Sequence, residues 1–372
     1  MRDLGALALG DLPNRFAGPR FDLAFIIGPA FLVTAIAVAA APWAQALKGF
    51  PVWLWAVLIL GVDVSHVYST VFRTYLDRGE LASRPRLYQL TPVLLWLAGA
   101  GLYALGGLVF WRALAWLAIF HFVRQQYGFM MIYARRDSGL KRLDQAAIYG
   151  ATLVPLIWWL THGRSFNWFV DGDVPTLLLP WLGWLAAGLY GLVLIAYGWR
   201  EIARWRTTAQ VNAPKNLLLA GTLLSWSVGI IAFDNDIVFT ATNVVAHGVP
   251  YMALNWLYGA NRRSVQDRPA YVSPVVGRLF QPAMIPVYVL LLAGFAFFEE
   301  GLWDGFVWRD HPHLFGAFAA LPVISDPLAL IWLVPLLSLP QSVHYVLDAF
   351  IWRKDGNVHD FSRILFHRAP HD

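Results

Sequence analysis

The sequence contains no cysteine among its 372 residues, and this absence excludes several kinds of site. Thiolate zinc sites, cysteine-ligated iron–sulfur clusters, covalently attached c-type haem and disulfides all require the sulfur atom. A metal bound by this chain must therefore be held by histidine, carboxylate, amide or tyrosine side chains.

Charged residues are also scarce. They make up 14% of the chain, whereas about 25% is usual for soluble domains, and apolar residues make up 58%. The mean hydropathy is +0.52. Several uninterrupted apolar runs reach the roughly 20 residues that a membrane-spanning helix requires, and they lack the alternation typical of membrane β-barrel strands. The sequence therefore predicts an all-α, polytopic integral membrane bundle.

Other motifs are missing as well. The four lysines, Lys48, Lys141, Lys215 and Lys354, lie between the apolar runs, so no amine is placed to form a retinal Schiff base. The absence of a Walker A loop argues against an ATP-driven pump. The paired-histidine boxes of membrane desaturases and hydroxylases are also absent from the apolar runs.

The apolar runs predict about ten transmembrane helices in one domain covering 1–372. They lie at 21–41, 51–72, 88–110, 112–133, 144–162, 175–199, 216–233, 236–258, 279–298 and 328–352. Short joints at 110–112 and 234–236 predict helical hairpin turns. The remaining parts are a short N-terminal segment 1–20, an external loop 299–327 and a tail 353–372. Within this loop, residues 314–324 predict a re-entrant or interfacial element.

Lysine and arginine alternate between the two sides of the expected bundle. Twenty-three of the 28 lie in the N-terminal segment, the tail and the connections after even-numbered helices, and Arg124 lies inside the fourth helix. The positive-inside rule then predicts that both termini are cytoplasmic. Because the basic residues form no stripe, we expect no nucleic-acid partner despite the net charge of +5. The expected partner is the lipid bilayer, and the expected location is the inner membrane of a bacterium.

Four of the expected helices each contain one histidine: His66, His121, His247 and His344. Ionisable side chains in the bilayer are costly, face the bundle interior, and are functional candidates by default. Counting about 1.5 Å per residue from the first basic residue after each helix places His66 and His344 roughly 10–13 Å deep, and the other two roughly 21–22 Å deep. The sequence thus predicts two tiers, forming one elongated site or two stacked sites if the helices are neighbours.

Two carboxylates share helical faces with these histidines. Asp63 lies three residues before His66, and Asp348 lies four residues after His344. Both aspartates are predicted metal ligands together with the four histidines.

Several other polar residues lie in the same helices. Arg124 and Gln125 follow His121 by about one turn, and both are predicted to bind a cofactor. Predicted catalytic or redox partners are Arg124, Tyr251, Asn255 and Tyr345.

Each of these side chains also has an ordinary structural explanation. A single histidine can hydrogen-bond to a neighbouring carbonyl, Asp63 and Asp348 can pair with nearby arginines, and Asn255 can join two helices. Four histidines in four separate helices, two of them beside an aspartate, favour a shared ligand over four unrelated roles.

Three functions fit this set of residues. The first is a metal-dependent oxidoreductase or oxygenase with a non-haem iron, copper or zinc ion, acting on a lipid, an isoprenoid or a quinol. The second is a b-type haem protein with axial pairs His121/His247 and His66/His344. The third is a proton-coupled transporter that uses the same residues as a conduction path. We favour the first.

The external loop and the helix before it contain a second polar cluster. A solvated loop is its simplest explanation, and adventitious metal binding is the alternative. Its members are Glu299, Glu300, Asp304, Asp310, His311 and His313.

Overall fold

The computed structural model describes residues 16–47, 49–137, 139–264, 271–353 and 361–366. Within these ranges the chain is helical and contains no strand, so the predicted all-α fold is confirmed. Most of the N-terminal segment and of the tail, including His359, His367 and His371, lies outside the described residues.

Adjacent elements often continue one another as one long helical segment. The segments in chain order are α1 (Pro19–Phe21) with η2 (Asp22–Ile27) and α2 (Gly28–Ala46); α3 (Val52–Trp55) with η3 (Ala56–Val64) and α4 (Ser65–Arg73); α6 (Pro85–Leu105); α7 (Gly107–Tyr133); α8 (Lys141–His162); α9 (Pro180–Thr208); α10 (Ala213–Trp226) with η4 (Ser227–Ala232); α11 (Asp236–Ser264); η5 (Pro282–Met284) with α13 (Ile285–Trp303) and η6 (Asp304–Trp308); and α14 (Pro327–Leu337) followed by α15 (Leu339–Ile351). Short helices α5 (Arg78–Ser83), α12 (Pro274–Arg278), η7 (Gly316–Phe318) and α16 (Phe361–Leu365) lie between or after them.

Eight of these segments are long and apolar enough to cross a membrane. The pair α14 and α15, bent by 45°, makes a ninth if it forms one span. The fifth predicted span, 144–162, is helical, as α8, but it is not among these segments; polar residues such as Gln145 and His162 reduce its hydropathy. The chain is therefore a multi-pass helical bundle, and the cytoplasmic placement of its termini stays a prediction.

The two predicted hairpin turns have different outcomes. Residues 233–235 join η4 to α11, which confirms the turn at 234–236. The turn predicted at 110–112 is wrong, because those residues lie inside α7. The actual turn is at Gly106, whose φ of +145° is accessible to glycine and strained for other residues. Hydropathy does not mark this turn, since the residues on both sides of it are apolar.

The expected re-entrant segment is mostly irregular. It contains only the 3₁₀ turn η7, and it packs back on α13, where Gly301 leaves space for the ring of Phe318. Phe315 in the same segment is 1% exposed.

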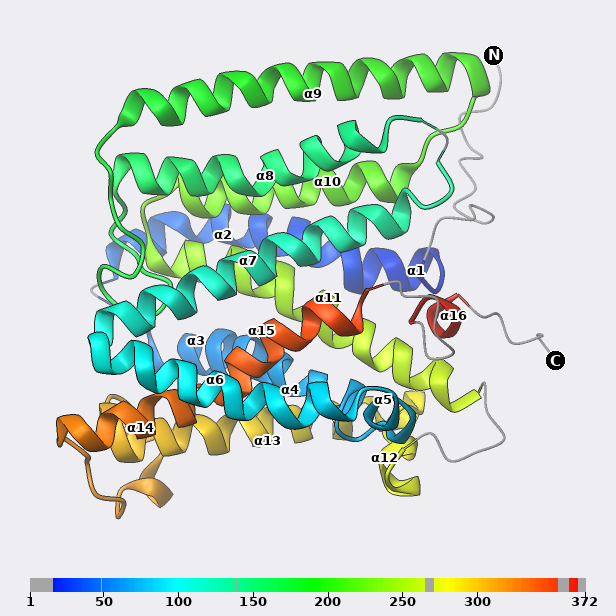
Figure 1. The fold of residues 1–372 in the computed structure, drawn as a ribbon. Helices are drawn as coiled ribbons and strands as arrows, with labels where there is room; N and C mark the ends of the chain where they lie inside the picture. The colour runs from blue at the N-terminus through cyan, green and yellow to red at the C-terminus, as the bar shows by residue number, and fades with distance from the viewer. Residues whose placement is uncertain (1–15, 48, 138, 265–270, 354–360, 367–372) are drawn as a thin grey trace.

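Helix α11 lies at the centre of the bundle, and α9 lies at its edge (Figure 1). In the most apolar window of each helix, 72% of the α11 residues are buried, compared with 17% for α9. Helix α11 packs against α2 and α4, while α15 packs against α4, α6 and α7. These contacts bring together the helices that contain the four histidines.

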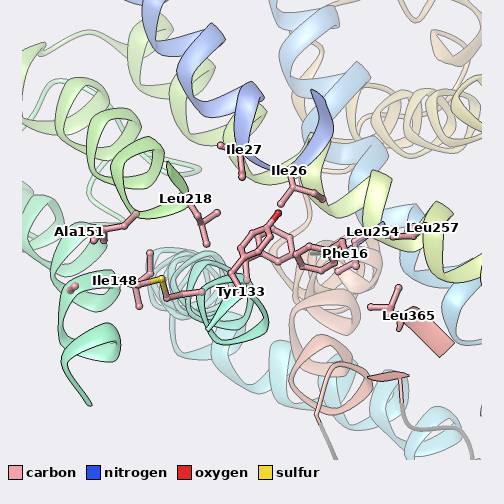
Figure 2. Close-up of a cluster of buried hydrophobic side chains, with 14 of the residues drawn as sticks. Phe16, Ile26, Ile27, Tyr133, Ile148, Ala151, Leu218, Leu254, Leu257 and Leu365 are labelled. Atoms are coloured by element: carbon pink, nitrogen blue, oxygen red, sulfur yellow. The ribbon is translucent and has the colours of Figure 1, made fainter. Parts of the chain in front are cut away.

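A large apolar cluster holds one end of the bundle together (Figure 2). It joins side chains of η2, α7, α8, α10, α11 and α16, including Ile26, Tyr133, Ile148, Leu218, Leu254 and Leu365. Tyr133 also donates a hydrogen bond of 3.1 Å to Asp22, which accepts the backbone N–H groups of Phe16 and Ala17. This cluster ties α7 and α11 together beyond the histidines.

Candidate metal centre

The four intramembrane histidines meet at one buried point. Each is 1–2% exposed, and one potential ligand atom from each lies within 4.8 Å of the others. The Nε2 atoms are 3.2 Å apart for His66 and His247, 3.1 Å apart for His247 and His121, and 3.1 Å apart for His121 and His344. The predicted separation into two tiers is wrong, because depth counted along each helix ignores the tilt of the helices.

The four imidazole rings form a square. Neighbouring ring centroids are 4.4–4.9 Å apart around the sequence His66, His247, His121 and His344. The centroids of His66 and His121, across the square, are 6.5 Å apart, and their rings are within 18° of parallel. A tetrahedral arrangement would make all separations equal, whereas the diagonal of a square is about 1.4 times its side, as observed here.

The size of this square suits a single metal ion. Three of its sides between Nε2 atoms are 3.1–3.2 Å long, and a square with such sides has its centre about 2.2 Å from each corner, close to the ~2.0–2.1 Å of a metal–imidazole bond. Two axial imidazoles on one haem iron would be about 4 Å apart, on opposite sides of a macrocycle. The 3.1 Å between His121 and His247 does not fit that arrangement, and four rings this close leave no space for two haems.

Asp348 supports two of the rings on their Nδ1 side, opposite the Nε2 atoms that meet in the square. Its Oδ2 lies 3.2 Å from Nδ1 of His121, and its Oδ1 accepts a hydrogen bond of 2.6 Å from Tyr251. The Tyr251 hydroxyl is 2.9 Å from Oγ1 of Thr70, which is 2.7 Å from Nδ1 of His344. One carboxylate thus orients His121 directly and His344 through two hydroxyls. Such carboxylate–histidine pairs orient metal-binding imidazoles and raise their basicity.

The other two rings have weaker partners. Asp63 Oδ1 is 3.8 Å from Nδ1 of His66, beyond hydrogen-bond distance. Nδ1 of His247 has no hydrogen-bond partner among the described residues. The ring of His247 is held instead by Phe122, which stacks on it at 3.6 Å with 10° between the planes. Both predicted aspartate ligands therefore lie on the Nδ1 side of the histidines, outside the square of Nε2 atoms.

One face of the square is covered by Tyr251. The centroid of its ring lies 4.9–6.3 Å from the centroids of all four imidazoles. Tyr251 follows His247 by one turn of α11, so it covers the face toward the C-terminal end of that helix. The opposite face is turned toward the end of the bundle where α11 begins.

The structure separates two residues that the sequence placed together. Gln125 is buried and donates a hydrogen bond of 3.0 Å to the carbonyl oxygen of His247, so it supports the cluster. Arg124 is exposed on the outside of the bundle, where it donates to the Tyr149 hydroxyl and lies 4.6 Å from the ring centroid of Tyr127. Arg124 therefore points away from the imidazoles, contrary to its predicted roles as a cofactor-binding and catalytic residue of the site.

The two remaining predicted residues, Tyr345 and Asn255, differ in their distance from the imidazoles. The ring of Tyr345 is 5.2 Å from that of His121, so it belongs to the wall of the site. Asn255 lies two turns beyond His247 on α11, where its amide donates to Ser69 and to the carbonyl of Tyr251. Asn255 therefore joins α11 to α4 and does not reach the imidazoles.

The sequence did not single out Thr70 or Phe122 as site residues. Thr70 shares a helical face with His66, and this spacing is a signal for it. Phe122 has no such signal, because its partner His247 is on a different helix and far away in the sequence.

One cavity lies beside the site, and a second lies apart from it. An apolar cavity of about 240 Å³ lies between α4, α6 and the bend before α15, and its lining includes Thr70, Pro92, Val343 and His344. A second cavity of about 290 Å³ lies at the end of the bundle where η6 follows α13, and it is lined by aromatic rings and carboxylates. The first cavity thus reaches a residue of the square.

These features define a multi-pass helical bundle of membrane type with a buried cluster of four histidines that can hold a metal ion. Comparison of the chain with models of known protein families, with curated proteins and with solved structures finds no match.

Proposed function

We propose that this protein is a membrane-embedded, metal-dependent oxidoreductase or oxygenase that acts on a lipophilic substrate at the four-histidine centre. The observation that supports this most directly is the convergence of four buried imidazoles, whose ligand atoms lie within 4.8 Å of one another and whose Nε2 atoms are 3.1–3.2 Å apart in three neighbouring pairs. Four imidazoles packed this closely, with hydrogen-bond acceptors behind two of them, are well explained by a cation among them.

The square arrangement favours a redox-active metal over zinc. Zinc in proteins is usually tetrahedral, whereas square-planar or tetragonal nitrogen sites are typical of Cu²⁺ and Ni²⁺, and imidazole also suits iron. The four histidines would hold such an ion, which would supply redox chemistry to a substrate bound beside it. The ring of Tyr251 covers one face of the square of imidazoles.

The apolar cavity supports a lipophilic substrate. It reaches His344 between α4 and α6. Both of these helices belong to segments that are long and apolar enough to cross a membrane. A lipid, an isoprenoid or a quinol could approach the square from the membrane without crossing a polar surface. The wall of this cavity includes the Thr70 hydroxyl, which also contacts His344 and Tyr251.

Metal analysis and an absorption spectrum of protein purified in mild detergent test the metal. We expect about one iron or copper ion per chain and no Soret band. His121→Ala or His247→Ala should lose the ion, while the control His313→Ala, in an exposed position of the external loop, should retain it. A Soret band, or full occupancy in both intramembrane variants, would contradict the proposal. Absence of any ion would favour the proton-relay alternative.

The substrate class needs a second experiment. Decylubiquinol, oleate and farnesol serve as quinol, acyl and isoprenoid probes, and turnover or a change in the metal spectrum is measured with each. Val343→Trp should fill the apolar cavity and abolish the response while the metal remains bound. The matched control Val289→Trp places the same ring on an exposed face of α13 and should leave the response intact. Lack of response to all three probes by metal-loaded protein would overturn the lipophilic substrate.

A further inference from the structure

The second cavity is acidic and lies apart from the histidines. Its lining combines the carboxylates of Glu300, Asp304 and Asp310 with the rings of Trp55, Trp111 and Trp308. Asp310 is exposed at its mouth, and Asp304 is only 3% exposed. The cavity therefore connects the aqueous end of the bundle to buried carboxylates.

These carboxylates lack cationic partners. Oδ1 of Asp304 accepts the backbone N–H of His311, but its buried Oδ2 has no hydrogen-bond partner. In the part of the chain that the structure describes, no lysine or arginine forms an ion pair with Glu300, Asp304 or Asp310. Behind them Glu299 is 3% exposed, and neither of its oxygens has a partner in hydrogen-bond geometry, although Tyr68 and Trp303 lie beside it. A buried carboxylate without a partner is costly unless a cation or a proton compensates it.

The acidic groups continue from the cavity toward His66, a corner of the square. Gln341 lines the cavity and precedes His344 by three residues on α15. Asp63 precedes His66 by three residues, lies 3.8 Å from its ring, and is within electrostatic range of Glu299 and Glu300. Carboxylates are thus spaced from the mouth of the cavity to the ring of His66.

The other face of the square offers no comparable route. Tyr251 covers it, and the Trp352 indole approaches the Tyr251 hydroxyl at 3.5 Å. Beyond them lies the buried guanidinium of Arg73, 5.5 Å from the centroid of Trp352 and paired with Glu80. The carboxylates on that side already have partners, Asp348 with Tyr251 and His121 and Glu80 with Arg73, whereas Asp304 at the acidic cavity keeps an unpartnered oxygen.

We propose that the acidic cavity is the port through which a metal cation from the aqueous phase reaches the four-histidine centre. This inference rests on the proposed metal centre. A cleft of one sign of charge with low-dielectric walls concentrates counter-ions and raises their association rate by about 10- to 1,000-fold. The acidic groups therefore act on the rate of metal entry, whereas the four imidazoles determine how tightly the ion is held.

Timed metal loading tests the port. Protein stripped of metal with a chelator receives Co²⁺ at low ionic strength, the reaction is stopped with EDTA at intervals, and cobalt per chain is measured after desalting. The double variant Glu300→Gln/Asp310→Asn should load about tenfold more slowly than the parent chain and reach the same final occupancy. The control Asp171→Asn, which removes an exposed carboxylate at the same end but outside the cavity lining, should load at the parent rate.

The outcomes distinguish this proposal from the metal centre itself. If the parent chain never retains cobalt, the proposed metal centre fails. If the parent chain loads and the double variant loads equally fast, the centre stands and the port is wrong. The port is also wrong if the double variant loads normally but changes the pH dependence of turnover, since the cavity would then conduct protons. Asp310→Lys at the exposed mouth provides a second variant that leaves the buried groups intact, and it should slow loading at least as much.

Discussion

Oδ2 of Asp348 lies 3.2 Å from Nδ1 of His121, on the side of the ring away from the other imidazoles. Because Nδ1 faces the carboxylate, Nε2 is left as the atom that points into the square. The same carboxylate accepts a hydrogen bond from Tyr251, so α15 and α11 are tied together beside the site. Asp348 therefore acts as a positioning residue for the ring, and its effect should be visible in metal affinity.

Asp348→Asn should lower metal affinity by about 10- to 100-fold, the usual effect of losing such a partner. The amide cannot strengthen the basicity of His121 as the carboxylate does. Competition with a chelator of known affinity measures the change. Asp63→Asn is the comparator and should cost less, because Asp63 lies 3.8 Å from His66, beyond hydrogen-bond distance. Equal losses in the two variants would show that only the charge of the aspartates matters.

Thr70→Val should weaken metal binding by roughly tenfold, because the variant removes the hydroxyl between His344 and Tyr251 while preserving shape. Thr70→Ser keeps the hydroxyl and should restore most of the affinity. The same chelator competition provides the measurement. Unchanged binding in Thr70→Val would mean that His344 needs no support from α4.

Gly150→Ala should destabilise the bundle by about 1–3 kcal/mol, because the added methyl group would lie 2.2 Å from the ring of Tyr190 where α8 meets α9. Gly128→Ala is the matched control, since its added methyl group meets nothing within 4 Å and alanine favours the helix by up to about 1 kcal/mol. Thermal unfolding in detergent compares the two variants. Equal melting temperatures would indicate that α9 is loosely attached.

Asp137, in the connection between α7 and α8, is expected to make the stability of the fold depend on pH in the acidic range. Burial raises the pKa of its carboxyl, but Arg204, Lys215 and Asn212 outweigh this and hold the pKa below its ordinary value of 3.8. A lowered pKa stabilises the fold at pH values above the unfolded pKa, and this contribution is lost as the pH falls through the folded pKa. Asp137→Asn should cost about 1–3 kcal/mol near pH 7.

The difference between Asp137→Asn and the parent chain should shrink as the pH is lowered toward 3. Thermal unfolding measured from pH 7 to pH 3 tests this dependence. A gap that stays constant with pH would show that the interactions of Asp137 with Arg204 and Lys215 do not depend on its charge.

Hydropathy was sufficient to predict the helices, and the single histidine in each of four helices predicted the members of the site. Hydropathy could not predict the turn at Gly106, because no polar residue interrupts the apolar run there. It also overstated α8, whose polar residues leave it outside the set of membrane-length apolar helices. Length and apolar content therefore predict that a segment is helical more reliably than they predict that the helix crosses the membrane.

The orientation of side chains required the packing of the helices. Gln125 and Arg124 follow His121 by four and three residues, and the boundary between the buried and exposed faces of α7 falls between them. A difference of one residue is about 100° around the helix, so one side chain supports the site and the other leaves it. The meeting of His66 with His247 depends on how α4 crosses α11, which a single sequence does not specify.

The square also constrains the biogenesis of the protein. Its corners come from α4, α7, α11 and α15, and a ribosome releases these helices in that order. The nascent chain has at most three of the four imidazoles of the site until α15 has been inserted and has closed against α4 and α7. Coordination by all four rings is consequently complete only once the last helix of the bundle is in place, whether the ion enters before or after that step.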